Sequence, residues 1–337
     1  MTVPHIAVAA LGGTIAMTSD TGARVTPTLQ ADDLIAAVPQ LRDLATVTAT
    51  TLATTPSASL TSRDLRSVLD WARAEVTGGA AGVVITQGTD TLEESAYWLD
   101  LHWDRPEPLV VTGAMRTPAS AGADGPANLL AAVATAASPH ARDRGVLVVL
   151  NDTVHSAAPV QKGRSSGPDA FVSHPFGPLG FIEEGQLHCR SAAQRWPSLP
   201  LPPTKGDPLA PPVALLETHL DDGGDVLDLV TAAGYRGVVI AGFGVGHVSE
   251  PMTASIDRAL AAGTVVVLGT RTGNGTTHTH TYGFPGSESD LLARGVIGAG
   301  WLHPRKARIL LAELLRLGAT SPELAAQFAH RGATRPT

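Results

Sequence analysis

Short apolar or alternating segments that stop at polar turns recur along the chain, and each predicts a strand. Five such segments lie in the first half of the sequence, at residues 6–11, 47–53, 82–86, 108–112 and 145–150. Stretches with the apolar spacing of a helix separate them, at residues 32–38, 61–74, 90–102 and 124–137. Because strands that alternate with helices form parallel sheets, the pattern predicts a mostly parallel, doubly wound α/β sheet.

A proline-rich stretch divides the chain into two regions. Residues 191–212 contain seven prolines, which is typical of a semi-rigid linker. Beyond this stretch, further elements are predicted at residues 213–216, 237–242, 265–269 and 306–317, the first three as strands and the last as a helix. We therefore expect a larger N-terminal α/β domain (1–190), a linker (191–212) and a smaller C-terminal α/β domain (213–337).

The strand at 82–86 leads into a polar turn, Thr86-Gln87-Gly88-Thr89-Asp90, and then into a helix. Asp90 and Glu93 have the spacing of a capping box, which predicts the start of that helix. Hydroxyl, amide and carboxylate groups therefore lie at the carboxyl end of a buried strand, where open α/β sheets bind their ligands. The pattern alone fits two interpretations, a capped turn without chemistry and a binding site.

Two further strand ends carry hydroxyl groups. After the strand at 6–11, Gly12 and Gly13 permit close backbone approach, so Thr14 is either a nucleophile beside main-chain donors or part of a plain turn. Residues 17–31 follow directly and are rich in Thr, Ser, Gly and Pro, which is typical of a mobile loop that acts as a lid. Ser57, after the strand at 47–53, is a candidate residue for contacting a bound ligand.

Composition and charge narrow the functional classes. The 337 residues include no apolar run of about 20, so no membrane span is predicted. The first residues lack a secretory signal, and we therefore expect a cytoplasmic protein. The formal net charge of −7, with scattered basic residues, argues against nucleic acid as a partner. Only three of the 24 basic residues are lysines, so Lys162 in a polar segment stands out.

Metal and cofactor sites have little support in the sequence. Cys189 is the single cysteine, and it is either a catalytic thiol or part of a hairpin predicted around 181–187. His278 and His280 fit either a metal site or a polar loop. Residues 242–246 are glycine-rich but lack the dinucleotide-binding spacing. We therefore predict no metal and no cofactor.

Six motifs occur in the order found in one enzyme family. They lie at residues 12–16 (GGTIA), 86–94 (TQGTDTLEE), 113–116 (GAMR), 123–129 (ADGPANL), 151–154 (NDTV) and 304–308 (PRKAR). Together they resemble the bacterial-type L-asparaginase and glutaminase-asparaginase family over nearly the whole chain. The first two motifs are the family's signatures, and the others agree in order and spacing.

The resemblance implies two α/β domains, a homotetramer or homodimer with active sites at subunit interfaces, and no metal or cofactor. It implies that Thr14 attacks the side-chain amide and that Thr89, Asp90 and Lys162 form a second catalytic cluster. The division of roles between the two threonines stays open. The substrate-binding residues implied by the resemblance are Gly13, Ser57, Ala58, Gly88, Thr89, Asp90, Ala114 and, from the neighbouring subunit, Glu288.

The chemistry of these residue types agrees with such roles. A hydroxyl nucleophile needs a proton acceptor and needs donors for the oxyanion, and the backbone amides of Gly13, Gly88 and Thr89 are candidate donors. Lys162 beside a hydroxyl is a candidate base, although the neighbouring Asp90 opposes the loss of its proton. Asp90 is the candidate that binds the substrate ammonium group.

Three departures from the family pattern concern the substrate pocket. The lid tyrosine is missing from residues 22–26, and a lid arginine or threonine, Tyr282 or a water molecule are candidates to replace it. Val245 stands where the family often has asparagine in a Gly-Asn-Gly turn. Gln87 and Ala58 replace a common histidine and a common glutamine, which bears on the preference between asparagine and glutamine.

We predict an amidohydrolase that converts L-asparagine to L-aspartate and ammonia through a threonyl acyl-enzyme. Two other interpretations use the same motifs. The first is a glutaminase-asparaginase of broader specificity or an ammonia-supplying amidotransferase component. The second is a catalytically weak protein that binds or senses asparagine.

Overall fold

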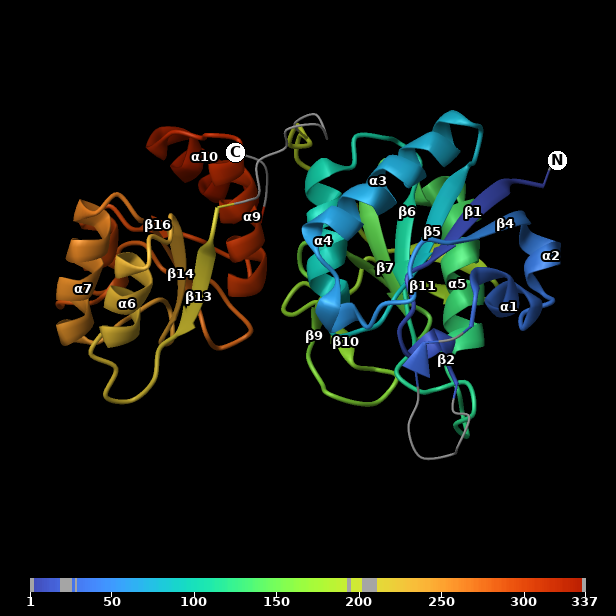
Figure 1. The fold of residues 1–337 in the computed structure, drawn as a ribbon, viewed down its shortest axis with the longest axis horizontal. Helices are drawn as coiled ribbons and strands as arrows, with labels where there is room; N and C mark the ends of the chain where they lie inside the picture. Colours follow the sequence, from blue (N-terminus) through green and yellow to red (C-terminus); the bar gives the residue numbers. More distant parts are fainter. Residues whose placement is uncertain (1–2, 19–25, 28, 193–194, 202–210, 335–337) are drawn as a thin grey trace. The chain divides into compact units, whose positions relative to one another are not determined.

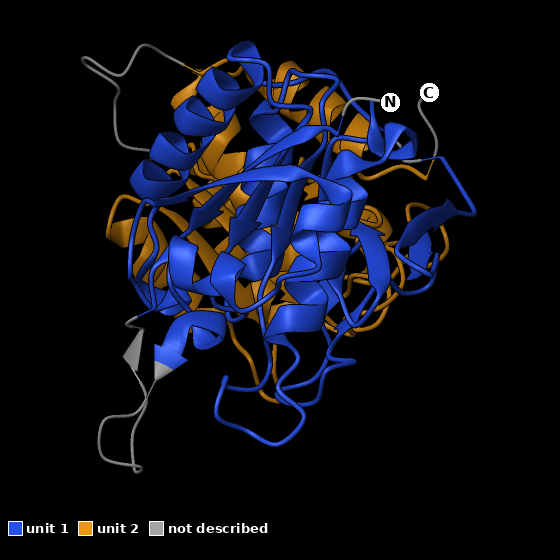
Figure 2. Ribbon diagram, turned by 90° about the vertical axis from the view of Figure 1, so that its right-hand side faces the viewer, with its two compact units in different colours: residues 1–199 blue, residues 200–337 orange. Residues whose placement is uncertain are grey.

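The computed structural model describes residues 3–18, 26–27, 29–192, 195–201 and 211–334. The chain forms two compact units, residues 1–199 and 200–337, which Figure 2 distinguishes by colour. The division between them lies inside the proline-rich segment 191–212. Of the predicted lid at 17–31, residues 19–25 and 28 lie outside the described residues, and this includes most of the stretch that lacks the tyrosine.

The first unit is built on a sheet that has eight strands within the described residues, in the order β12-β11-β8-β7-β6-β5-β1-β4 (Figure 1). Neighbouring parallel strands form most of it: β1 (His5–Ala10), β4 (Thr46–Thr51), β5 (Gly82–Thr86), β6 (Leu109–Thr112) and β7 (Val146–Leu150). Antiparallel strands complete one edge: β8 (Thr153–Ser156), β11 (Gly180–Glu183) and β12 (Gln186–Cys189). The predicted mostly parallel sheet and the hairpin around 181–187 are therefore confirmed, and Cys189 ends that hairpin.

Helices cover both faces of this sheet, which explains why its central strands are apolar without alternation. The helices α3 (Ser62–Thr77) and α4 (Leu92–His102) lie on one face (Figure 1). The other face carries α1 (Ala31–Ala36), α2 (Leu41–Leu44) and α5 (Gly125–Ala137), and η3 (Pro139–Ala141) follows α5. In β5, Val83, Val84 and Ile85 are all fully buried.

The start of α4 differs from the prediction. Its N-cap is Thr91, without a side-chain cap, so the predicted capping box of Asp90 and Glu93 is wrong. The Glu93 carboxylate instead accepts a hydrogen bond from the backbone N–H of Lys162, and the Asp90 carboxylate accepts one from the Lys162 side chain. Lys162 lies in β9 (Gln161–Lys162), which pairs with β10 (Phe171–Val172). Partners distant in sequence have thus replaced the local capping pair.

The second unit contains a parallel sheet in the order β13-β14-β15-β16. Its strands are β13 (Val213–Glu217), β14 (Gly237–Gly242), β15 (Val265–Thr270) and β16 (Ile297–Gly298). Its helices are α6 (Asp225–Ala232), α7 (Glu250–Ala261), α8 (Glu288–Ala293), α9 (Pro304–Arg316) and α10 (Ser321–Arg331). The helices α6 and α7 lie on one side of the sheet and α9 on the other (Figure 1). The predicted two-domain α/β architecture is confirmed.

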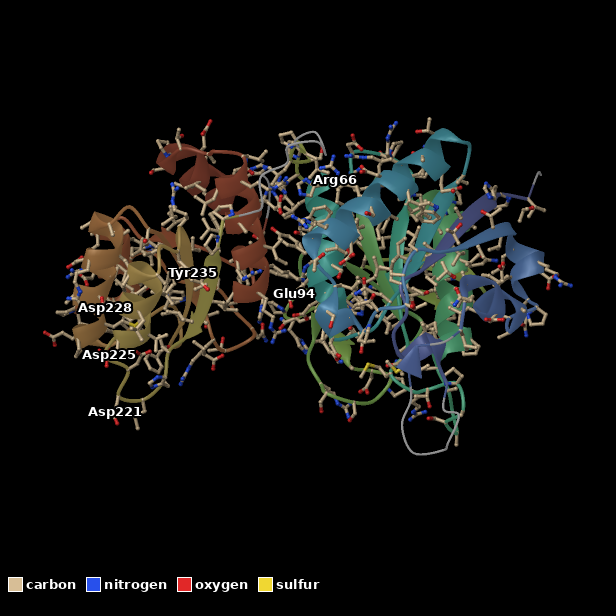
Figure 3. The ribbon with its side chains drawn as sticks, in the orientation of Figure 1. Arg66, Glu94, Asp221, Asp225, Asp228 and Tyr235 are labelled. Carbon is tan, nitrogen blue, oxygen red and sulfur yellow. The ribbon has the colours of Figure 1, made fainter. Side chains whose placement is uncertain are left out.

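Charged side chains on α6 and α7 pair at the surface of the second unit. Figure 3 labels Asp225 and Asp228 on α6. Asp228 forms an ion pair of 2.6 Å with Arg258 of α7. The hydrogen bond from this guanidinium holds the pKa of Asp228 below its ordinary value.

Within the described residues, no helix is both long enough and apolar enough to traverse a bilayer.

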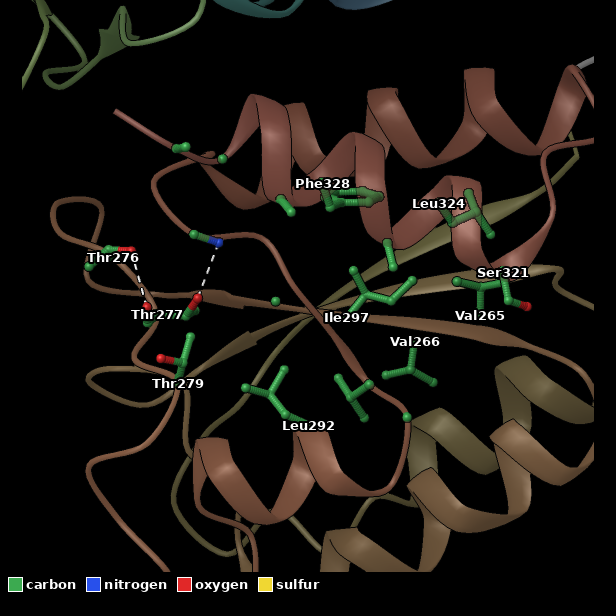
Figure 4. Close-up of a pocket in the computed structure, with 18 of the residues that line it drawn as sticks. Val265, Val266, Thr276, Thr277, Thr279, Leu292, Ile297, Ser321, Leu324 and Phe328 are labelled. Atoms are coloured by element: carbon green, nitrogen blue, oxygen red, sulfur yellow. Dashed lines mark hydrogen bonds between the residues drawn. The ribbon is translucent and has the colours of Figure 1, made fainter. Parts of the chain in front are cut away.

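A pocket of about 810 Å³, open to the surface, lies between the sheet and α10 of the second unit (Figure 4). Val265, Ile297 and Phe328 supply part of its apolar lining. The hydroxyl of Thr277 accepts a hydrogen bond from the Gly300 N–H at 3.1 Å, so this polar group in the lining is satisfied. None of the site residues predicted above lines this pocket.

Candidate active site

The polar turns after β1, β4 and β5 meet at the carboxyl edge of the large sheet. Gly13 has a φ of +88°, and a Cβ built on it would lie 2.1 Å from the backbone nitrogen of Gly88. A Cβ on Gly88 would lie 2.6 Å from Oγ of Ser57. The turns after β1 and β5 therefore pack backbone against backbone, and the turn after β5 packs against the Ser57 side chain, so only glycine allows this approach at positions 13 and 88.

Thr14 begins the short 3₁₀ helix η1 (Thr14–Ala16) directly after Gly13. Ile15 and Ala16 are buried, which anchors the turn, whereas Thr14 is half-buried. The chain then enters β2 (Met17–Thr18), which pairs with β3 (Thr26–Pro27). A short antiparallel ladder thus begins directly after η1, so Thr14 comes between a glycine turn and the predicted lid along the chain.

Lys162 connects β9 to the turn after β5. Its Nζ donates hydrogen bonds to Thr89 Oγ1 at 2.9 Å and to Asp90 Oδ1 at 2.8 Å. Thr89 is 6% exposed, whereas the side chain of Asp90 is 69% exposed. The lysine therefore holds a buried hydroxyl on one side and a solvent-accessible carboxylate on the other.

Ser57 holds the same turn from the side of β4. It lies in the 3₁₀ helix η2 (Ser57–Ser59) and is 3% exposed. Its Oγ accepts the backbone N–H of Asp90 at 3.2 Å, and its carbonyl accepts the Thr91 hydroxyl at 2.9 Å. The adjacent Ala58 is exposed. Ser57 thus positions Asp90, and Ala58 offers no polar atom of its side chain.

Several backbone N–H groups at the meeting point of these turns have no partner among the described residues. Among the described residues, the N–H groups of Gly13, Thr14, Gly88 and Thr89 have no hydrogen-bond acceptor in the protein. Backbone amides without an acceptor attract a carboxylate or a developing oxyanion. The arrangement therefore combines hydroxyl groups, an ammonium group and anion-binding amides in one place.

The turn after β6 is held by two polar residues at the start of α5 whose roles the sequence analysis did not assign. Asp124 accepts the backbone N–H groups of Met115 and Arg116, both at 2.9 Å. Asn128 donates to the Gly113 carbonyl at 3.0 Å and accepts the Asn151 N–H at 2.8 Å. This clamp fixes the backbone around the fully buried Ala114. The sequence feature that could have predicted this clamp is the pair of polar residues four positions apart at the start of an alanine-rich helix.

Glu288, the remaining predicted site residue, belongs to the second unit and is fully buried. Its carboxylate accepts the N–H groups of Thr281 and Tyr282 at 2.8 and 2.9 Å and contacts His247 Nε2 at 3.1 Å. Burial raises its pKa, but these hydrogen bonds outweigh burial and leave the pKa below its ordinary value. Its contribution to the active site of a neighbouring subunit stays a prediction.

The remaining candidates have local partners. His278 Nδ1 lies 3.1 Å from the Thr281 hydroxyl, and His280 Nδ1 lies 2.9 Å from the Thr279 hydroxyl. Within the described parts of the chain, no group of three or more His, Cys, Asp or Glu side chains is arranged to hold a metal ion. Of the residues considered as a lid replacement, Tyr282 lies in the second unit and packs edge-to-face with His247, with ring centroids 4.9 Å apart.

Two family models match the chain. The model for "Asparaginase, N-terminal" matches residues 5–195, and the model for "Glutaminase/Asparaginase C-terminal domain" matches residues 212–328. L-asparaginase 2 of Escherichia coli (strain K12) is 34% identical over 316 residues, which cover 92% of this chain and 88% of that protein. The glutaminase-asparaginase of Acinetobacter glutaminasificans is 32% identical over 318 residues, covering 91% and 94%. The solved structure of a probable cytoplasmic L-asparaginase from Campylobacter jejuni matches with a TM-score of 0.86 and 33% identity, covering 97% of this chain and 99% of that one.

Proposed function

Because the chain belongs to the asparaginase family, we propose that it hydrolyses the side-chain amide of L-asparagine, with Thr14 as the nucleophile. The resemblance carried by the six sequence motifs is thereby confirmed. One observation carries the mechanistic part of the proposal. The Gly13-Thr14 turn lies against the Gly88-Thr89 turn, and Thr89 is hydrogen-bonded to Lys162.

The proposed reaction has two steps. The Thr14 oxygen bonds to the amide carbon, its proton passes to the leaving nitrogen, and the C–N bond breaks to release ammonia. This step leaves an aspartyl ester on Thr14. Water then attacks the ester carbon, one of its hydrogens returns to the Thr14 oxygen, and L-aspartate leaves. The unpaired backbone amides support this reaction because an oxyanion develops in both steps.

The pair of Lys162 and Thr89 is suited to assist proton movement. An ammonium group has donors and no acceptor, so Lys162 must donate to Thr89 Oγ1. The hydroxyl hydrogen of Thr89 is then left to point toward substrate or water. We assign to Thr89 the orientation of the attacking water or of the leaving group, and to Lys162 the orientation of Thr89.

Substrate recognition is proposed on the same residues. The exposed carboxylate of Asp90 binds the α-ammonium group. Glu288 from a second subunit joins it once the contacts that bury its carboxylate beside Thr281, Tyr282 and His247 have opened. The amides at Gly13, Gly88 and Thr89, with Ser57 and Ala58 beside them, surround the α-carboxylate and the reacting amide. The backbone of Ala114 contributes to the amide end. A cofactor has no role in this scheme.

Assembly and location are finer proposals. A homotetramer, or at least a homodimer, follows from the role given to Glu288, and light scattering that finds an active monomer would refute it. A cytoplasmic location is supported by similarity to the Campylobacter jejuni protein, which is a probable cytoplasmic L-asparaginase. Fractionation of cells that express the native gene tests it, and recovery of the protein outside the cytoplasm contradicts it.

Ammonia release from L-asparagine and L-glutamine tests the proposal. Thr14→Ala and Thr89→Val are each expected to lower kcat by at least about 10³-fold, because residues that act as one catalytic unit fail together. Thr46→Val is the matched control, since Thr46 is exposed at the opposite end of β4. Equal rates on both amides would favour the glutaminase-asparaginase interpretation. An inactive parent that still binds asparagine would favour the binding protein.

A further inference from the structure

Gln87 is fully buried one residue before Gly88, and only one of the two polar atoms of its side-chain amide has a hydrogen-bond partner among the described residues. Its Nε2 donates to the Gly88 carbonyl at 3.2 Å and to the Ser95 hydroxyl at 3.2 Å. Its Oε1 is buried without a hydrogen-bond donor among the described residues. A buried acceptor without a partner destabilises the folded state, so packing alone does not account for an amide at this position.

The orientation of the Gln87 amide is determined by its neighbour. If the amide were turned over, Oε1 would lie against the Gly88 carbonyl, and two acceptors would face each other. Nε2 must therefore face Gly88. The unpaired oxygen is a consequence of supplying a donor at that point.

The bond to Gly88 also sets the direction of the next N–H group. The Gly88 carbonyl and the Thr89 N–H belong to one planar trans peptide and point in opposite directions. A donor that holds the carbonyl therefore holds the N–H as well. Within the described chain, this N–H has no acceptor in the protein, while the Thr89 side chain is held by Lys162.

We propose that Gln87 is a positioning residue that aims the Thr89 N–H at the reacting amide carbonyl of the substrate. The inference rests on the proposed amidohydrolase function. Gln87 itself does not touch the substrate, because its side chain is enclosed and acts through the Gly88–Thr89 peptide. Stability is sacrificed at Oε1 for the orientation of a donor in the transition state.

Gln87→Met removes the donor and the unpaired oxygen while keeping a similar shape. We expect kcat for ammonia release to fall about 10- to 100-fold with KM within about threefold, as a part of the loss seen when an oxyanion donor is removed. The melting temperature is expected to stay within about 4 °C of the parent, because removal of the unpaired Oε1 offsets the loss of the two hydrogen bonds made by Nε2. Gln87→His restores a ring N–H donor and is expected to recover most of kcat.

Three results would overturn the inference. The first is an unchanged kcat in Gln87→Met. The second is a melting temperature of Gln87→Met more than about 4 °C below that of the parent, which would indicate a packing role. The third is a kcat of Gln87→His no higher than that of Gln87→Met. Failure of the proposed function is distinguished by the parent, which would release no ammonia. In that case amide hydrogen exchange decides. The Thr89 amide must exchange about tenfold faster in Gln87→Met than in the parent, and equal exchange refutes the positioning role.

Discussion

Replacing Lys162 with methionine is expected to lower kcat for ammonia release by about 10- to 160-fold. The lysine donates to Thr89 Oγ1 at 2.9 Å, and Thr89 is only 6% exposed, so the hydroxyl is left buried without this partner. A hydrogen bond to a charged group contributes about 1.5–3 kcal/mol, and each 1.36 kcal/mol is about tenfold in rate. The side chain of Asp90 is 69% exposed, so its lost ion pair costs about 0–1 kcal/mol at most.

The assay compares kcat and KM of the parent, Lys162→Met and the matched control Arg164→Met. Arg164 lies two residues further along and pairs with Asp169, but both side chains of that pair are 58% exposed. The control is therefore expected to keep kcat within about twofold. Thermal unfolding of all three proteins shows whether a rate change reflects the site or the fold.

A Lys162→Met variant that keeps more than half of the parent's kcat and unfolds at the parent's temperature would refute this role of Lys162. In that case the contact between Lys162 and Thr89 has no part in the rate-limiting step. A similar loss in Arg164→Met would also contradict it, because the effect would then belong to the charge of the segment.

Two further predictions concern the turn and the second unit. Gly13→Ala is expected to lower the melting temperature by more than about 10 °C, because the added Cβ would lie 2.1 Å from Gly88 N. Gly79→Ala is the matched control, since Gly79 also has a positive φ but a Cβ there would meet nothing within 4 Å. An equal effect of both substitutions would show that the contact with Gly88 is not the cause. Glu288→Gln is expected to destabilise by about 1–2 kcal/mol at pH 7. Because the pKa of Glu288 in the folded protein lies below its ordinary value of 4.5, the ionised carboxylate stabilises the fold at pH values above 4.5. This stabilisation is lost as the pH falls through the folded pKa. Denaturant unfolding at low pH must therefore show a smaller difference in stability between the parent and Glu288→Gln.

Local pattern predicted most of the first unit's elements. The run of Val83, Val84 and Ile85 indicated a strand buried on both faces, and all three side chains are fully buried between helices. The hairpin that contains Cys189 followed from alternation. The capping box of Asp90 and Glu93 was wrong because both carboxylates accept hydrogen bonds from Lys162, which is distant in sequence.

The candidate site divides in the same way. Thr14, Ser57, Gly88 and Thr89 were recognisable because each lies in a polar turn at a strand end. Their mutual contact was not, since strand order decides which turns meet, and the order β5-β1-β4 places strands distant in the chain side by side. The clamp of Asp124 and Asn128 was missed because helix periodicity shows that two polar residues share a face but does not show what that face contacts.

The sequence by itself determined the alternation of strands and helices, the glycine turns and the family, because periodicity and short motifs are properties of neighbouring residues. Only the tertiary structure decided that Lys162 reaches Thr89, that Glu93 holds the backbone of Lys162, and that Gln87 is enclosed with one unpaired oxygen among the described residues. These are contacts between groups far apart in the chain or enclosed by others. They exist only once burial of the apolar faces has brought the strand ends together.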